Sequence, residues 1–169
     1  MNDTERLALE QEFEAKSAKL TEMMARMPEM EAAYTKYEAA ARAGVIAALY
    51  DAFKEETEEL ARMEQHVEKA REALNAATKA ANKDRIAAAR EALQSEELAC
   101  DHAKTLLEKA QARYEEEVTR QHFESEAAWQ AAFLGKPAFM KLEETIQPFR
   151  QEYAQLFTRC QEIEALLDE

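Results

Sequence analysis

The sequence predicts an all-α protein built around a long antiparallel helical hairpin, in which two helices form a coiled coil. Only two of the 169 residues are glycine and three are proline, whereas 34% are charged, a composition typical of long helices. Between positions 46 and 114, apolar residues recur at alternating steps of three and four, which is the a/d spacing of a coiled coil. This pattern is interrupted near 82–85, where we expect the tip of the hairpin.

The first helix is expected to begin near Asp3 or Thr4, because either side chain can cap a helix N-terminus. An apolar stripe follows as far as Met27. Pro28 should end this helix or restart it, because proline disfavours helical geometry in the preceding residue but suits a first helical position. The helical pattern then resumes and passes through Gly44. Glycine costs about 1 kcal/mol relative to alanine inside a helix, so Gly44 should mark a bend or a close backbone contact.

Residues 46–121 are assigned to the hairpin. At a rise of about 1.5 Å per residue, arms of about 36 residues would each be about 54 Å long. An antiparallel fold with its turn near Lys83 brings apolar residues of the two arms opposite each other without adjustment. The predicted seam pairs Phe53 with Tyr114, Leu60 with Leu107, Val67 with Cys100, and Leu74 with Leu93.

A joint is expected at the base of the hairpin. The same register sets Gly44 opposite Phe123, where the pattern of the descending helix also ends. Ser125 should cap a short helix over about 125–134, and Gly135 should cap the C-terminus of that helix. The residues expected to form the core of the joint are Gly44, Tyr50, Phe123, Trp129, Phe133 and Phe139. We interpret this aromatic cluster as packing rather than as a ligand site.

The last helix is predicted from about Pro137 to Leu167, with Pro148 either kinking it or starting a new helix. One apolar face runs along it, and its natural partner is the first helix. This pairing would place both termini at one end. Residues 1–45 and 122–169 would then form the base of a rod.

The charge distribution bears on partners and compartment. A formal net charge of −13 disfavours direct binding of most of this surface to nucleic acid, although an acidic surface that mimics DNA is an alternative. No apolar run approaches the ~20 residues that a membrane-spanning helix needs, and the polar N-terminus does not resemble a signal peptide. We therefore expect a soluble cytoplasmic protein with protein partners, or one that self-associates.

The sequence carries no motif for catalysis, and we expect no enzyme activity, cofactor or metal. It lacks a phosphate-binding loop, a C-x-x-C pair and a G-x-S-x-G nucleophile elbow. One cluster is a candidate metal site, because the register places His66 near Asp101, beside Cys100 and His102. Cys100 and His102 point in different directions on a helix, so we favour one buried cysteine and two solvated histidines.

Two segments resemble the coiled-coil arms of SbcC, the SMC-like ATPase subunit of a bacterial DNA-end-processing nuclease. The segment 122–134, HFESEAAWQAAFL, together with Leu142-Glu143, is similar to a patch on the returning arm of that family. Residues 25–31, ARMPEME, and 37–49, YEAAARAGVIAAL, resemble the outgoing arm. In the predicted register, the segments of the returning and the outgoing arm lie side by side at the same level along the hairpin. The resemblance implies a structural arm in a DNA-repair complex.

This chain also departs from the SbcC pattern. Members of that family carry nucleotide-binding head motifs at both ends and a C-x-x-C hook at the apex, whereas the apex here is Asn82-Lys83-Asp84. No catalytic residue is therefore carried over. The first functional expectation is a non-catalytic arm. The alternative is a stand-alone acidic helical protein-binding module, such as a phage-type inhibitor, a chaperone, a scaffold or a DNA mimic.

Overall fold

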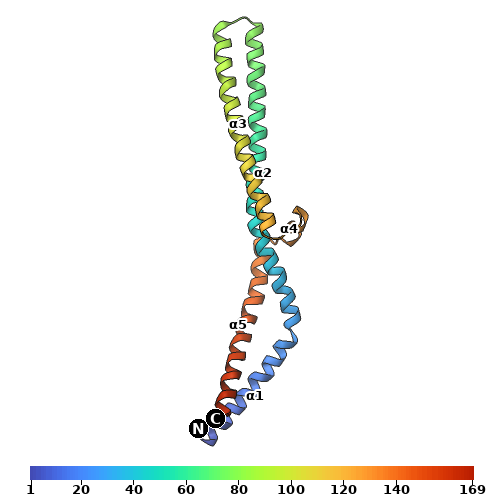
Figure 1. Ribbon diagram of the computed structural model, residues 1–169, viewed down its shortest axis with the longest axis vertical. Helices are drawn as coiled ribbons and strands as arrows, with labels where there is room; N and C mark the ends of the chain where they lie inside the picture. The colour runs from blue at the N-terminus through green and yellow to red at the C-terminus, as the bar shows by residue number, and fades with distance from the viewer. The chain divides into compact units, whose positions relative to one another are not determined.

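A computed structural model describes residues 1–169 and shows an all-helical protein, which confirms the predicted all-α class (Figure 1). None of the helices is long and apolar enough to cross a membrane. The helices are α1 (Asp3–Ala25), α2 (Met27–Lys79), α3 (Lys83–Arg120), α4 (Glu126–Ala132) and α5 (Lys136–Leu167).

The chain divides into two compact units. The first unit comprises Met1–Ala41 and Leu134–Glu169, and the second comprises Arg42–Phe133. Helix α2 therefore contributes its N-terminal part to the first unit and the rest to the second. The sequence assigned the short helix to the base with the chain ends, and this is corrected here, because α4 belongs to the second unit, where Trp129 joins the core.

In the first unit, α1 lies against α5. Helix α1 is capped by Asn2, not by Asp3 or Thr4 as expected. The Asn2 side chain accepts a hydrogen bond from the Glu5 N–H at 2.8 Å, and the Glu5 carboxylate accepts one from the Asn2 N–H at 3.0 Å. This reciprocal capping box satisfies two backbone donors that the helix start would otherwise leave free.

The interruption at Pro28 is a restart. Helix α1 ends at Ala25, and α2 begins at Met27 with Pro28 as its second residue, where the missing N–H of proline removes no helical bond. By contrast, Pro148 lies inside α5 without ending it. The core of this unit is formed by Met23, Met30 and Phe149, with Met27, Tyr153 and Leu156 packed against them.

Polar contacts also join α1 to α5. The Arg159 guanidinium donates to both carboxylate oxygens of Glu12, at 2.7 and 3.0 Å, and this hydrogen bonding lowers the pKa of Glu12 from 4.5 to about 2. Because the pKa is lowered in the folded state, the pair stabilises the fold above pH 4.5, and its contribution is lost as the pH falls toward 2. Near the chain ends, Arg6 donates to the Leu167 carbonyl at 3.4 Å. The two termini are therefore neighbours within this unit.

In the second unit, α2 and α3 are consecutive helices joined by a turn of three residues, Ala80–Asn82 (Figure 1). Asn82 caps α3 by accepting a hydrogen bond from the Arg85 N–H at 3.2 Å. Polar contacts cross between the helices: His66 Nδ1 lies 3.7 Å from a Glu96 carboxylate oxygen, and Arg71 forms an ion pair with Glu97 at 4.0 Å. The turn therefore comprises residues 80–82, whereas the sequence placed the tip at 82–85, where α3 has already begun at Lys83.

The segment after α3 contains the predicted short helix. Ser125 caps α4 by accepting from the Ala128 N–H at 3.1 Å, as expected, and the helix ends at Ala132 instead of Leu134. Gly135 does not cap α4. Instead, Gly135 lies at the N-cap of α5, and its φ of −62° is not a left-handed conformation. The C-cap of α4 is Phe133.

Gly44 plays neither of the roles that the sequence suggested. Helix α2 continues through it without a break, and an added Cβ would meet no atom within 4 Å. The expected interruption on the ascending side is therefore absent, and no backbone approaches Gly44 closely. Only the descending side is interrupted, at residues 121–125.

Candidate functional site

The residues of the predicted seam are the less exposed residues of their helices. Val67, Cys100 and Tyr114 are buried, and Phe53, Leu60, Leu74, Leu93 and Leu107 are half-buried, whereas most residues between them are exposed. Phe53 and Tyr114 are in contact, with ring centroids 5.6 Å apart and ring planes at 78°. This edge-to-face geometry is a favourable one for aromatic pairs.

An aromatic cluster lies where α2, α3 and α4 meet in the second unit. Its buried residues are Ala43, Ile46, Tyr114 and Trp129, and the half-buried Tyr50, Phe53 and Phe123 pack against them. The Tyr50 ring lies 5.3 Å from the Trp129 ring and 5.4 Å from the Tyr114 ring. The structure thus brings together three of the residues predicted for the joint, Tyr50, Phe123 and Trp129.

The two polar atoms buried in this cluster are paired with each other. The Trp129 indole Nε1–H donates to the Tyr114 hydroxyl at 2.9 Å, and that hydroxyl donates to Glu126 at 3.3 Å. Burial of the phenol raises the pKa of Tyr114 above its ordinary value. Helix α4 is therefore attached to α3 by an apolar side chain and a short chain of hydrogen bonds.

Arg42 connects the start of the second unit to the end of α3. Its guanidinium donates to the Gln121 carbonyl, one of the groups that a helix C-terminus leaves without a partner, and it lies 4.9 Å over the ring of Phe123. No sequence pattern singled out Arg42. The signal that could have found it is an arginine opposite the expected break in the descending helix.

Two predicted members of the joint core lie elsewhere. Phe139 belongs to the first unit and stacks on Tyr37, with ring centroids 4.9 Å apart, so its assignment to the cluster of Trp129 was wrong. Phe133 is 42% exposed and lies at the edge of a shallow depression that Tyr50 and Trp129 also line. It is therefore not a core residue.

The histidine and cysteine cluster does not assemble as the register suggested. His66 faces Glu96 and not Asp101, with its Nδ1 3.7 Å from a carboxylate oxygen. Cys100 is buried, whereas His102 is exposed. No three histidine, cysteine, aspartate or glutamate side chains converge in a geometry that could hold a metal ion.

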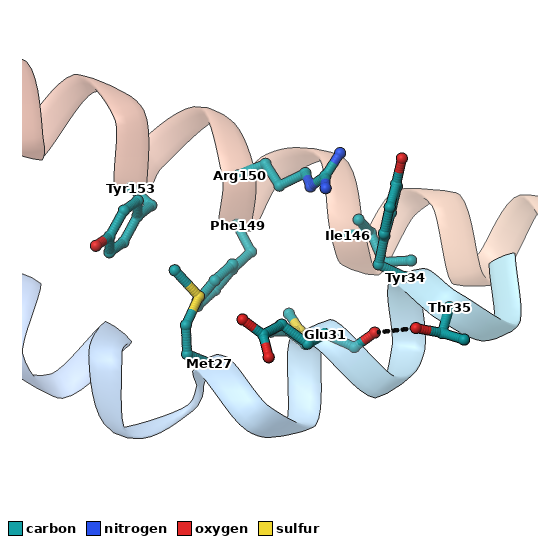
Figure 2. Close-up of a pocket in the computed structure, with 9 residues that line it drawn as sticks. Met27, Glu31, Tyr34, Thr35, Ile146, Phe149, Arg150 and Tyr153 are labelled. Carbon is teal, nitrogen blue, oxygen red and sulfur yellow. Dashed lines mark hydrogen bonds between the residues drawn. The ribbon is translucent and has the colours of Figure 1, made fainter. Parts of the chain in front are cut away.

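The largest cavity is a groove in the first unit, between the start of α2 and the middle of α5. Its volume is about 500 Å³, and Figure 2 shows its walls. The residues that line it are Met27, Met30, Glu31, Tyr34, Thr35, Ile146, Phe149, Arg150 and Tyr153. We call this cavity the Met27–Tyr153 groove.

Of the charged side chains that border this groove, the arginines lie over aromatic rings and the glutamate has no ionic partner. The Arg150 guanidinium lies 3.7 Å from the centroid of the Tyr34 ring, and the Arg26 guanidinium lies 5.5 Å from that of Phe149. Both cations are therefore engaged with aromatic faces. The Glu31 side chain is exposed and lies at the wall of the groove, as Figure 2 shows, and it forms no ion pair.

The sequence did not predict this groove, although its apolar residues lie on the predicted stripes of their helices. The helix restart at Pro28 was the available signal. A helix that stops and restarts does not keep its apolar stripe in register with its partner, and this leaves room beside Met27 and Phe149.

Comparisons with known proteins add no identification. No protein-family model, no curated protein and no solved structure matches the chain.

Proposed function

We propose that this protein is a non-catalytic structural element whose second unit is an antiparallel coiled-coil hairpin, similar to the arms of the SbcC ATPase. The observation that carries the proposal is the single stripe of buried and half-buried residues, repeated every seven residues from Phe53 to Leu74 and from Leu93 to Tyr114. A narrow stripe of this kind suits pairing with one other helix and leaves no interior for a substrate.

Two polar residues within the stripe also fit the role of a structural arm. Glu56 and Glu96 interrupt the stripe, and Glu96 lies opposite His66, so that one interruption has a partner across the seam. Polar residues at seam positions reduce stability but help to specify one register. In a structural arm, the side chains of the seam keep two long helices aligned, and a mechanical role requires no catalytic group.

The register can be tested through Cys100, which the seam places opposite Val67. In a Cys160→Ser background, Val67→Cys leaves thiols only at 67 and 100. We expect mild oxidation to join them within one chain, because a disulfide needs Cα atoms about 4.4–6.8 Å apart. The measurement is the loss of free thiols, with peptide mass mapping of the linked fragments.

The matched control is Leu74→Cys in the same background. It occupies the same stripe but lies seven residues further along α2, roughly 10 Å from position 67, so it should not link to Cys100. Efficient linkage of Leu74→Cys, or none for Val67→Cys in a folded protein, would mean that the proposed register is wrong.

A stand-alone acidic protein-binding module is the second candidate function, and it covers inhibitors, chaperones, scaffolds and DNA mimics. The net charge of −13 and the Met27–Tyr153 groove favour it. An acidic surface attracts basic partners, and this attraction weakens as salt is added.

A further inference from the structure

We propose that the Met27–Tyr153 groove is a docking site for a basic amphipathic helix of a partner protein. An apolar side chain of that helix would enter the cavity, and a lysine or arginine of the same helix would lie against Glu31. The groove belongs to the first unit and the seam to the second, so this inference does not depend on the structural role proposed above.

The size and the lining of the cavity fit the apolar part of such a helix. A volume of about 500 Å³ is within the range of protein ligand pockets and can take one large side chain with its neighbours. Met30, Ile146 and Phe149 are buried and form apolar walls, and Met27 is half-buried beside them. Methionine side chains are flexible and polarisable, so such walls adapt to the shape of an inserted residue.

The net charge of −13 and the unpaired Glu31 favour a basic partner, whereas the Arg150 guanidinium, which also lines the groove, keeps its charge over the Tyr34 ring. Arg26 and Arg150 lie over the rings of Phe149 and Tyr34, so neither guanidinium pairs with a carboxylate at this wall. Glu31 is the only acidic residue that lines the groove, and no cation neutralises it. A cation placed beside the exposed Glu31 would gain a surface ion pair at the edge of the cavity.

The same charges disfavour a second copy of this chain as the occupant. Each copy carries a net charge of −13, so two copies repel each other on approach. A basic helix is attracted instead, and helix-in-groove recognition uses apolar anchors spaced at i, i+3, i+4 and i+7.

The experiment uses a synthetic probe, a leucine–lysine peptide of about five helical turns with its leucines at that spacing. Binding to the full chain is measured by titration with NMR detection of methionine methyl groups. We expect saturable binding that shifts the signals of Met27 and Met30 and leaves Met63 of the second unit unchanged. Two kinds of control peptide should bind at least about tenfold more weakly. The first has the same composition in scrambled order, and the second is a leucine–glutamate peptide with the same pattern.

Charge-reversal variants locate the contact. Glu31→Lys should weaken binding of the peptide about tenfold, because it replaces the paired anion with a cation. Glu29→Lys makes the same change in net charge on the same helix but outside the groove, and it should leave the affinity nearly unchanged. Both residues are exposed, so both variants should fold, which circular dichroism checks.

Several results would overturn the proposal. These are an absence of saturable binding, equal binding of the scrambled peptide, equal losses for the two variants, or shifts of Met63 as large as those of Met27. A Met27 signal that depends on protein concentration without peptide, together with a dimer in sedimentation, would identify a second copy as the occupant and would also overturn it.

Discussion

Two non-glycine residues, Ala81 and His122, adopt left-handed backbone conformations, with φ of 53° and 60°. Each follows the C-terminus of a helix. After α2, the Asn82 N–H bonds the Ala77 carbonyl at 3.4 Å, and the Ala81 N–H bonds the Thr78 carbonyl at 3.1 Å. This is the Schellman pattern, which satisfies carbonyls that a helix end leaves free. Alanine is strained in this position because its Cβ approaches the following carbonyl oxygen.

Replacing Ala81 by glycine should therefore stabilise the protein. The relief of strain, roughly 1–2 kcal/mol, exceeds the entropy that glycine adds to the unfolded chain, and we expect a net gain of about 0.5–1 kcal/mol. The control is Ala76→Gly, a change inside α2 that should cost about 1 kcal/mol. The measurement is thermal or urea unfolding. A lower melting temperature for Ala81→Gly, as expected for Ala76→Gly, would contradict this account.

At the scale of elements, α4 shows how a short helix is held. It has only seven residues, too few to be stable alone, so its order depends on packing. Trp129 supplies that packing, since it is only 3% exposed and lies against Tyr50 and Tyr114. The indole N–H is buried there and depends on the Tyr114 hydroxyl as its acceptor.

Tyr114→Phe tests this attachment. The change removes the acceptor of the Trp129 N–H, and a buried donor without a partner costs about 1–3 kcal/mol. We expect lower stability and an emission of Trp129, the only tryptophan, shifted to longer wavelength as it becomes more exposed. Tyr50→Phe is the matched control, because its ring also contacts Trp129 but its hydroxyl makes no hydrogen bond. Equal effects of the two variants would exclude the hydrogen bond as the cause.

The helices themselves were largely predictable, but their ends were less so. Apolar residues at steps of three and four identified the apolar stripes of α2, α3 and α5. Burial of one helix face requires apolar residues at this spacing, so the stripe can be read from the sequence. Three caps were assigned wrongly or missed, at Asn2, Ala81 and Gly135. A cap depends on which of several adjacent polar residues reaches a free backbone group, and spacing alone does not decide this.

At the scale of the whole molecule, the two candidate functions differ in the size of the polypeptide that carries this chain. We expect an antibody against α2 and α3 to detect a polypeptide far larger than 19.3 kDa in an immunoblot of the source cell, because arms of SbcC-like proteins join nucleotide-binding heads. Competition with purified chain controls for the specificity of the antibody. A band near 19.3 kDa would instead support the stand-alone acidic module.

The sequence alone determined the all-α class, the apolar stripes and the net charge. All of these follow from local composition and periodicity, which need no knowledge of distant contacts. The sequence also indicated that aromatic residues gather near Trp129. It did not indicate that Phe139 would lie apart from them, because membership of a cluster depends on which elements pack together.

Only the tertiary structure decided how the chain divides into two units and where its largest cavity lies. The Met27–Tyr153 groove combines residues more than a hundred positions apart, and its charge pattern arises because Arg26 and Arg150 stack on rings that the fold brings to them. The role of Arg42 at the end of α3 has the same origin, since its acceptor is 79 residues away. Contacts at such separations depend on the packing geometry of whole helices, which local sequence patterns do not encode.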